Sequence, residues 1–348
     1  MINGSALFPS GISSKAFNFH DIALVQRWSL SDPIDPLGTL LSAFPPATGR
    51  ESVTITLDLS SSSNREKGHV GFLASCRPIF FFGCVQVYVS EQGFVLSDGA
   101  STVVTHQGTS TISASLARLP SGVVSPLGTG ILHMALPLVL REHGVFDIHA
   151  GAVVTAAGHP YVIVGDSGAG KTTLTLALLE SGCSYLGDDK ILIRRHSDKA
   201  IAYLSYPREF HLTSLTLEAF STRFAGLSLE EINLVETGEL PAKRSVAVSP
   251  YYPSAHRREA MRPAALLFPH VVSSAISSVK RMASAEAFGL LIAGSALAVV
   301  DGISRRDEQL ALLRDIVNAA RNFEIQLGRD LLTQPQATAE RLKLAIDG

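Results

Sequence analysis

The sequence of 348 residues has few features of secreted or membrane-spanning proteins. Its three cysteines, Cys76, Cys84 and Cys183, form an odd number without metal-ligand spacing, which favours buried free thiols in a reducing cytoplasm. The amino terminus lacks a charged segment followed by an apolar core, so no secretory signal is expected. The longest apolar run, 287–300, is too short to cross a bilayer and predicts a buried helix and strand. These absences exclude a membrane partner and predict a cytoplasmic protein.

Charge is also scarce. The chain has 29 Lys and Arg against 31 Asp and Glu, a formal net charge of −2, so nothing marks nucleic acid as its main partner. Hydrophobic residues make up 46% and charged residues 17%, which is enough apolar material for two packed cores. No internal repeat or low-complexity tract is present. A globular protein of two domains is expected.

Residues 165–172 read Gly-Asp-Ser-Gly-Ala-Gly-Lys-Thr and match the phosphate-loop pattern G-x-x-x-x-G-K-[ST]. The apolar stretch 161–164 predicts a buried strand before this loop, and the Leu- and Ala-rich stretch 172–180 predicts a helix after it. The glycines permit a backbone whose N–H groups surround an anion at the helix N-terminus. Lys171 is then expected to reach the β- and γ-phosphates of ATP, and the Thr172 hydroxyl to ligate Mg²⁺. A glycine-rich turn that fits the pattern by accident is the alternative. The predicted nucleotide-binding residues are Gly165, Asp166, Ser167, Gly168, Ala169, Gly170, Lys171, Thr172 and Thr173.

Two adjacent carboxylates follow the next predicted strand. The helix is expected to stop at Gly182, and 183–186 predicts a short strand that ends at Gly187-Asp188-Asp189. Because ligands bind beyond the carboxyl ends of strands in parallel α/β sheets, this pair would face the same crevice as the phosphate loop. One Asp would hold Mg²⁺ and the other accept a proton, although a solvated turn is the alternative.

The phosphate loop, the helix after it and the sequence Gly187-Asp188-Asp189-Lys190-Ile191-Leu192-Ile193 closely resemble the catalytic domain of HPr kinase/phosphorylase. That family also has a His before the loop strand, matched here by His149 in Ile148-His149-Ala150-Gly151. The resemblance covers about 145–195 well and extends loosely to about 330. It implies a fold related to phosphoenolpyruvate carboxykinase, with Asp189 as the general base and His149 near the transferred phosphate. We assign Mg²⁺ to Thr172 and Asp188. Without the family, His149 is typical of a structural histidine held by a backbone carbonyl.

The resemblance fails at the Arg-Gly step of the family, a dipeptide that occurs nowhere in this chain, which puts HPr in doubt as the substrate. Instead, Tyr206-Pro207-Arg208 resembles a stretch of HPr-kinase-like proteins encoded with ribosomally made, modified peptides, lasso peptides among them. Arg208 is a candidate catalytic residue that would clamp a phosphate, with a solvated loop arginine as the alternative. The basic stretch 240–262 predicts either a lid over the nucleotide or a solvated loop. Its candidates, among which the sequence does not choose, are Lys243, Arg244, Arg257, Arg258 and Arg262.

The first third of the chain has a different pattern. Apolar residues alternate with polar ones over 53–57 and 85–89, with turn residues between, which predicts a meander of short strands. Residues 1–22 show no clear period and predict an extension. A helix over 127–143, broken or kinked at Pro137, follows. We predict an α/β protein with a β-rich domain over 1–125, for acceptor recognition or assembly, and an HPr-kinase-type phosphate-loop catalytic domain over 126–348.

The expected function is an ATP- and Mg²⁺-dependent kinase that transfers the γ-phosphate to a hydroxyl, with Ser or Thr of a peptide or protein as the favoured acceptor. A ribosomal precursor peptide is one such partner, and homo-oligomers are left open. The alternatives are a nucleotide-binding regulatory protein with little turnover, a kinase of a small hydroxylated metabolite, and a phosphorylase that uses inorganic phosphate. Intact Lys171, Thr172 and Asp189 argue against a degenerate site, and the missing Arg-Gly step disfavours the phosphorylase.

Overall fold

The computed structural model divides the chain into two compact units, Met1–His143 and Gly144–Gly348, each built of both strands and helices. In the part of the chain that the structure describes, no helix is long and apolar enough to cross a membrane. The described residues are 12–29, 36–47, 53–58, 76–91, 93–119, 124–207, 209–225, 227, 234–235, 243–248, 250–252, 256–261, 264–295, 300 and 303–348.

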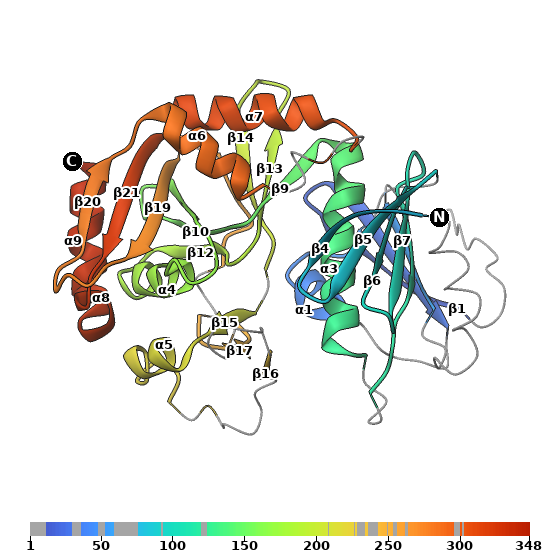
Figure 1. Ribbon diagram of the computed structural model, residues 1–348, viewed down its shortest axis with the longest axis horizontal. Helices are drawn as coiled ribbons and strands as arrows, with labels where there is room; N and C mark the ends of the chain where they lie inside the picture. The colour runs from blue at the N-terminus through green and yellow to red at the C-terminus, as the bar shows by residue number, and fades with distance from the viewer. Residues whose placement is uncertain are drawn as a thin grey trace, which may run out of the picture. The chain divides into compact units, whose positions relative to one another are not determined.

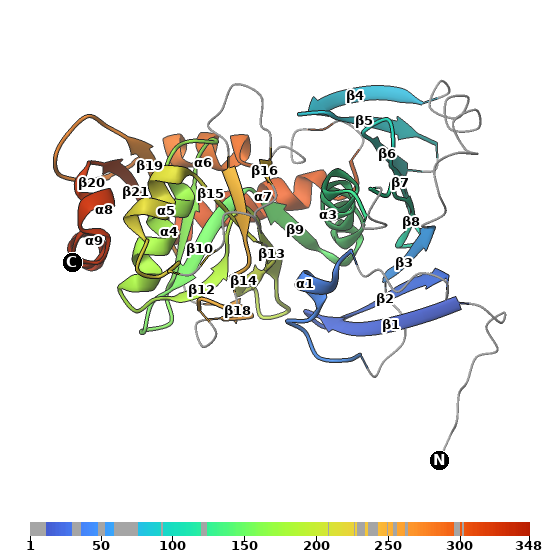
Figure 2. The same ribbon diagram turned by 90° about the horizontal axis from the view of Figure 1, so that it is seen from below.

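The first unit contains an eight-stranded sheet in the order β1-β2-β3-β8-β7-β6-β5-β4 (Figure 2). Strand β3 runs parallel to both of its neighbours, and the other pairs are antiparallel. The patterns at 53–57 and 85–89 form β3 and β5 as predicted. The strands are β1 (Ile12–Phe19), β2 (Ile22–Ser29), β3 (Val53–Asp58), β4 (Arg77–Phe82), β5 (Val85–Ser90), β6 (Gly93–Ser97), β7 (Thr102–His106) and β8 (Thr111–Ser115).

The expected extension over 1–22 differs from the structure at residues 12–22, which form β1 and the start of β2 as part of the sheet. A two-residue turn joins these strands, since Phe19 pairs with Ile22. Both turn residues, His20 and Asp21, have positive φ angles, 52° and 66°. Such turns match the twist of a hairpin but usually carry glycine or asparagine, so the sequence lacks the usual hairpin signal. Residues 1–11 lie outside the described part of the chain.

Helix α3 (Pro126–Leu140) belongs to the first unit, although the sequence placed it in the second. Ser125 caps it by accepting a hydrogen bond from the Gly128 amide at 3.1 Å. The helix continues through Pro137 instead of breaking there, and a short 3-10 turn (Arg141–His143) follows it. Its buried apolar side chains pack on β6, β7 and β8, so tertiary packing outweighs the cost of a proline inside the helix. The first unit also contains α1 (Gly38–Leu41).

The second unit is built on a six-stranded sheet in the order β12-β10-β11-β19-β21-β20. Strand β10 is antiparallel to both β11 and β12, so β11 and β12 run in the same direction. Strands β19 and β21 are parallel to β11. The carboxyl ends of these four strands therefore meet at one edge, although the sheet is mixed rather than all parallel. The bounds are β10 (Ala150–Val154), β11 (Pro160–Val164), β12 (Ser184–Gly187), β19 (Ala265–Val271), β20 (Ser278–Arg281) and β21 (Arg321–Leu327).

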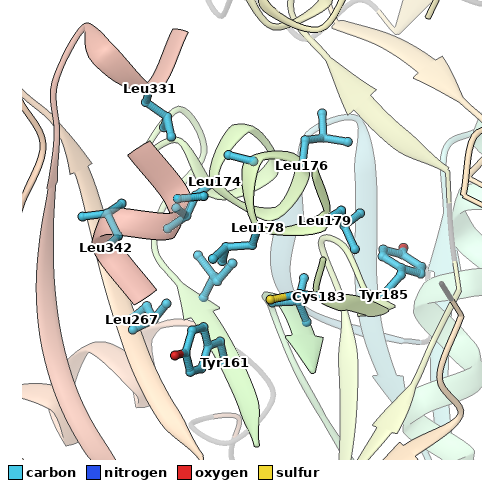
Figure 3. Packing of buried hydrophobic residues seen from close by; sticks show 14 of the residues in the cluster. Tyr161, Leu174, Leu176, Leu178, Leu179, Cys183, Tyr185, Leu267, Leu331 and Leu342 are labelled. Carbon is cyan, nitrogen blue, oxygen red and sulfur yellow. The ribbon is translucent and has the colours of Figure 1, made fainter. Parts of the chain in front are cut away.

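Helices cover both faces of this sheet (Figure 1). Along β11, Tyr161 and Ile163 pack toward α4, whereas Val162 and Val164 pack toward α6 and α7. Figure 3 shows the first of these cores, where leucines of α4 gather with Leu267 of β19 and Leu342 of α9. Burial on both faces makes β11 a continuous apolar run. The helices are α4 (Lys171–Glu180), α6 (Ser284–Ala293), α7 (Arg306–Ala319), α8 (Asp330–Thr333) and α9 (Pro335–Asp347).

A second sheet of this unit is antiparallel and has the order β18-β14-β13-β9. The chain passes between this sheet and the six-stranded sheet at two places. Strand β9 (Val145–Ile148) leads through His149 into β10, and β12 leads through residues 188–190 into β13 (Ile191–Arg195). Ile148 pairs with Ile191, which places the two crossings side by side. The remaining elements are β14 (Ile201–Ser205), β15 (Phe210–Leu212), α5 (Ser214–Ala219), β16 (Leu234–Val235), β17 (Lys243–Val246) and β18 (Glu259–Ala260).

Candidate active site

The phosphate loop lies between β11 and α4, as the sequence predicted. Gly168 and Gly170 have φ angles of 86° and 93°, which other residues rarely adopt. A Cβ built on Gly170 would lie 2.4 Å from Cδ1 of Leu327, so a larger residue there would also displace the Leu327 side chain. Helix α4 begins at Lys171, directly after the loop. Its first backbone N–H groups and its dipole favour an anion at this point.

Lys171 is folded back onto its own loop. Its Nζ donates to the carbonyl oxygens of Gly165 at 2.7 Å and Asp166 at 3.1 Å. It also lies 3.1 Å from Nε2 of His149. Because the lysine is buried, these acceptors compensate for the loss of hydration of its ammonium group. The same cation can turn to a phosphate in the loop, and His149 lies next to this cation.

The contacts of His149 determine its tautomer. Its Nδ1 is 2.7 Å from the carbonyl oxygen of Asp189, which only accepts, so Nδ1 carries the hydrogen. Burial is the largest effect on its pKa and lowers it below 6.5, against the opposing effect of the Asp189 charge. In the neutral ring, Nε2 then accepts from Lys171. His149 is thus held by a backbone carbonyl, as the structural alternative predicted. Its ring also lies beside Lys171 at the end of the phosphate loop.

Asp188 and Asp189 are adjacent in sequence but lie in different environments. Asp189 has a φ angle of 66°, a left-handed conformation that Asp tolerates better than most residues. Asp188 is 1% exposed, whereas the side chain of Asp189 is 36% exposed. Oδ1 of Asp189 lies 3.2 Å from Nδ1 of His149. The chain therefore presents one carboxylate to the interior and one to solvent at the end of β12.

Asp188 contacts the first turn of α4. Its Oδ2 accepts from the Thr172 hydroxyl at 3.0 Å, and its Oδ1 is buried without a hydrogen-bond partner. Burial, together with the charge of Asp189, raises the pKa of Asp188 to about 7. A Cβ on Gly151 of β10 would lie 3.3 Å from Oδ1, so a glycine there makes room for the carboxylate.

The donor set around Asp188 fits Mg²⁺. A carboxylate with an unpaired buried oxygen and a threonine hydroxyl are oxygen ligands of the kind that Mg²⁺ uses. Among the described residues, no group of three or more His, Cys, Asp or Glu could hold a metal. Such a site suits an ion that takes most of its ligands from water and nucleotide phosphates. Thr172 and Asp188 are the residues that would hold it.

Of the other predicted site residues, the structure describes Tyr206 and Thr173 but not Arg208. Tyr206 is fully buried, with the ammonium of Lys190 5.6 Å from its ring centroid, and Lys190 also pairs with Asp147 at 3.4 Å. Tyr206 is thus a core residue next to the Asp-Asp-Lys turn. Arg208 lies outside the described residues, so its role as a phosphate clamp stays a prediction. Thr173, in the first turn of α4, bonds the Thr216 hydroxyl of α5 at 3.0 Å.

The residues of the basic stretch 240–262 lie in different parts of the second unit. His256 pairs in parallel with Tyr185 of β12, and the Arg257 amide donates to the Tyr185 carbonyl at 2.7 Å. Arg257 and Arg258 are exposed, and the Arg258 carbonyl accepts from the Ser205 amide of β14 at 2.8 Å. Lys243 and Arg244 lie in β17, which pairs with β15 and β16. Arg262 is not described. The lid over the nucleotide stays a prediction.

Sequence reasoning missed two residues that shape this site. The carbonyl of Gly294, which caps α6, accepts from the His149 amide at 2.8 Å and so fixes the backbone at the histidine. Leu327, at the end of β21, fills the space beside Gly170. A glycine after an apolar helix and a leucine at a strand end are common features, and neither indicates a contact with residues so distant in the chain.

No family model matches this sequence, and a search of curated proteins finds no match. Among solved structures, the chain is similar to the Hpr(Ser) kinase/phosphatase from Coxiella burnetii, at 10% sequence identity and a TM-score of 0.29. The alignment covers 58% of this chain and 99% of that chain.

Proposed function

We propose that this protein is an ATP- and Mg²⁺-dependent phosphotransferase that moves the γ-phosphate to a hydroxyl group. The observation that carries the proposal is the different placement of the two carboxylates beside the phosphate loop. Asp188 is buried against Thr172, where a metal ligand belongs, and Asp189 is solvent-accessible beside His149, where a base can reach an acceptor. A binding loop alone does not require the second carboxylate.

Each residue has a role that follows from its contacts. Mg²⁺, when bound, neutralises charge on the phosphates. Lys171 supplies a further positive charge after it leaves one or more of its carbonyl acceptors. Asp189 accepts the proton of the attacking hydroxyl, and His149, with its hydrogen on Nδ1, holds Asp189 in place and presents Nε2 toward the lysine. Positioning and charge account for most of the barrier reduction in phosphoryl transfer, so these groups suffice.

For the acceptor, we propose Ser or Thr of a peptide or protein. The Tyr-Pro-Arg stretch, with its resemblance to kinases encoded beside modified peptides, supports a ribosomal precursor peptide. The β-rich first unit, which contains none of the phosphate-handling residues, is proposed to serve acceptor recognition or assembly. A small hydroxylated metabolite is the alternative acceptor, and a panel of both kinds of hydroxyl compound distinguishes them.

The proposal is tested by separating binding from transfer. Asp189→Asn keeps the size of the side chain but removes its basicity, so ATP–Mg²⁺ affinity should remain within about threefold while transfer falls by roughly 10² to 10⁴. Lys171→Ala should weaken ATP binding itself. Asp198→Asn, an exposed carboxylate in the turn between β13 and β14, is the matched control and should change neither. Affinity is measured by calorimetry, and transfer by radiolabel from γ-labelled ATP.

Transfer at the parental rate by the Asp189→Asn protein would contradict the base assignment. A parental protein that binds ATP–Mg²⁺ but modifies no hydroxyl in the panel would favour the regulatory alternative. Parental affinity for ATP in the Lys171→Ala protein would reject the phosphate loop as the nucleotide site.

A further inference from the structure

Two exposed aliphatic side chains, one at the end of β19 and one in the loop that follows it, have no role in the site described above. Val271 ends β19 and is 65% exposed, and Ile276 lies in the loop after β19 and is 62% exposed. A Cβ built on Gly170 would lie 3.6 Å from Cγ2 of Val271, which is van der Waals contact. A Cβ on Gly165 would lie 3.5 Å from the carbonyl oxygen of Pro269, in the same strand. The end of β19 therefore lines one side of the phosphate loop.

The loop that presents Ile276 is firmly held. The Ser277 amide and hydroxyl both donate to Oδ1 of Asp330, at 2.9 Å and 2.6 Å, and the Asp330 amide donates to the Ala275 carbonyl at 3.1 Å. A Cβ on Gly328 would lie 2.6 Å from the backbone of Ile276, so the loop packs closely against the end of β21. Ile276 is thus exposed on a loop that is already held in place, so a ligand that contacts it would not have to order this loop.

The strand order sets the direction of a bound nucleotide. Asp189 and His149 lie on the β10 and β12 side of the loop, whereas Val271 lies on the β19 side. In the proposed reaction the γ-phosphate must face Asp189. A nucleotide stretched across the loop from that point would place its base on the opposite side, which is the side of β19. The flat faces of a purine are largely apolar, and aliphatic side chains are suitable contacts for them.

We propose, on the basis of the proposed function, that Val271 and Ile276 form the surface on which the purine ring of the nucleotide packs. The contact is apolar and acts on the ring alone, because the phosphates are held by the loop and Lys171. A polyphosphate without a base therefore gains nothing from these two residues. This difference separates their contribution from that of the loop.

The test compares two probes, ATP and inorganic tripolyphosphate, each with Mg²⁺, by calorimetry on the full chain. The double substitution Val271→Ser with Ile276→Ser should raise the Kd for ATP about tenfold, in line with the loss of a good apolar contact, and leave the Kd for tripolyphosphate unchanged. Val271→Ala alone should give a smaller loss of the same kind. Leu344→Ser, which changes a leucine of α9 that is 77% exposed, is the control and should affect neither probe.

Parental affinity for ATP in the double variant would overturn the proposal. An equal loss of affinity for both probes would also overturn it, because the substitutions would then act on the phosphate loop rather than on the base. If the parental protein bound neither probe, the proposed function itself would fail, and the base surface with it.

Discussion

Replacement of Asp188 by Asn should make the ligand-free protein more stable at neutral and alkaline pH. The pKa of Asp188 is raised to about 7 from an ordinary value of 3.8, first by burial and then by the charge of Asp189. Between these two pH values the folded protein keeps a proton that the unfolded chain has released. The free energy of unfolding therefore falls as pH rises, by about 1.4 kcal/mol for each pH unit. From pH 3.8 to pH 7 the free energy of unfolding falls by about 4 kcal/mol in total. Asn has no proton to release, so the variant does not lose this stability.

The assay is urea denaturation of the parental and Asp188→Asn proteins from pH 4 to pH 8 without metal. The two stabilities should agree near pH 4 and diverge toward pH 8, with the variant the more stable. Asp189→Asn removes the neighbouring charge and should reduce this pH dependence without abolishing it. With ATP and Mg²⁺ at pH 8, the parental protein should gain more stability than Asp188→Asn, which lacks the metal-binding carboxylate. Equal pH dependence in the parental and Asp188→Asn proteins would refute the reasoning.

Two further predictions concern the loop and the division of the chain. Gly170→Ala should lower the free energy of unfolding by about 1–3 kcal/mol and weaken ATP binding, because alanine is strained at a φ of 93° and its Cβ would collide with Leu327. Urea denaturation measures the stability and calorimetry the ATP affinity of the same variant. Unchanged values of both would contradict the loop geometry. A truncated protein of residues 144–348 should bind ATP–Mg²⁺ as tightly as the full chain, since the phosphate-handling residues all lie in that unit. It should lose efficient transfer to the peptide acceptor. Full transfer by the soluble fragment would disprove an acceptor role for the first unit.

Several features of the site were predictable because they depend on residues close together in the chain. The phosphate loop, its strand and its helix occupy one continuous stretch, and the glycine spacing, Lys171 and Thr172 are each required locally. The same holds for the strand that ends at the Asp-Asp pair. Helix α3 shows the limit of such local reasoning. Its residues predict a helix, but the unit that it joins depends on which sheet its apolar face meets.

By itself, then, the sequence determined that a phosphate loop precedes a helix and that two carboxylates and a histidine occur nearby. Only the tertiary structure decided how those groups differ. The pairing of Ile148 with Ile191 brings His149 to Asp189, which lies 40 residues away in the chain. Burial beneath Thr172 then gives Asp188 a pKa unlike that of an exposed carboxylate. These properties arise from desolvation and from charges that only folding brings close together, so the residue pattern alone does not contain them.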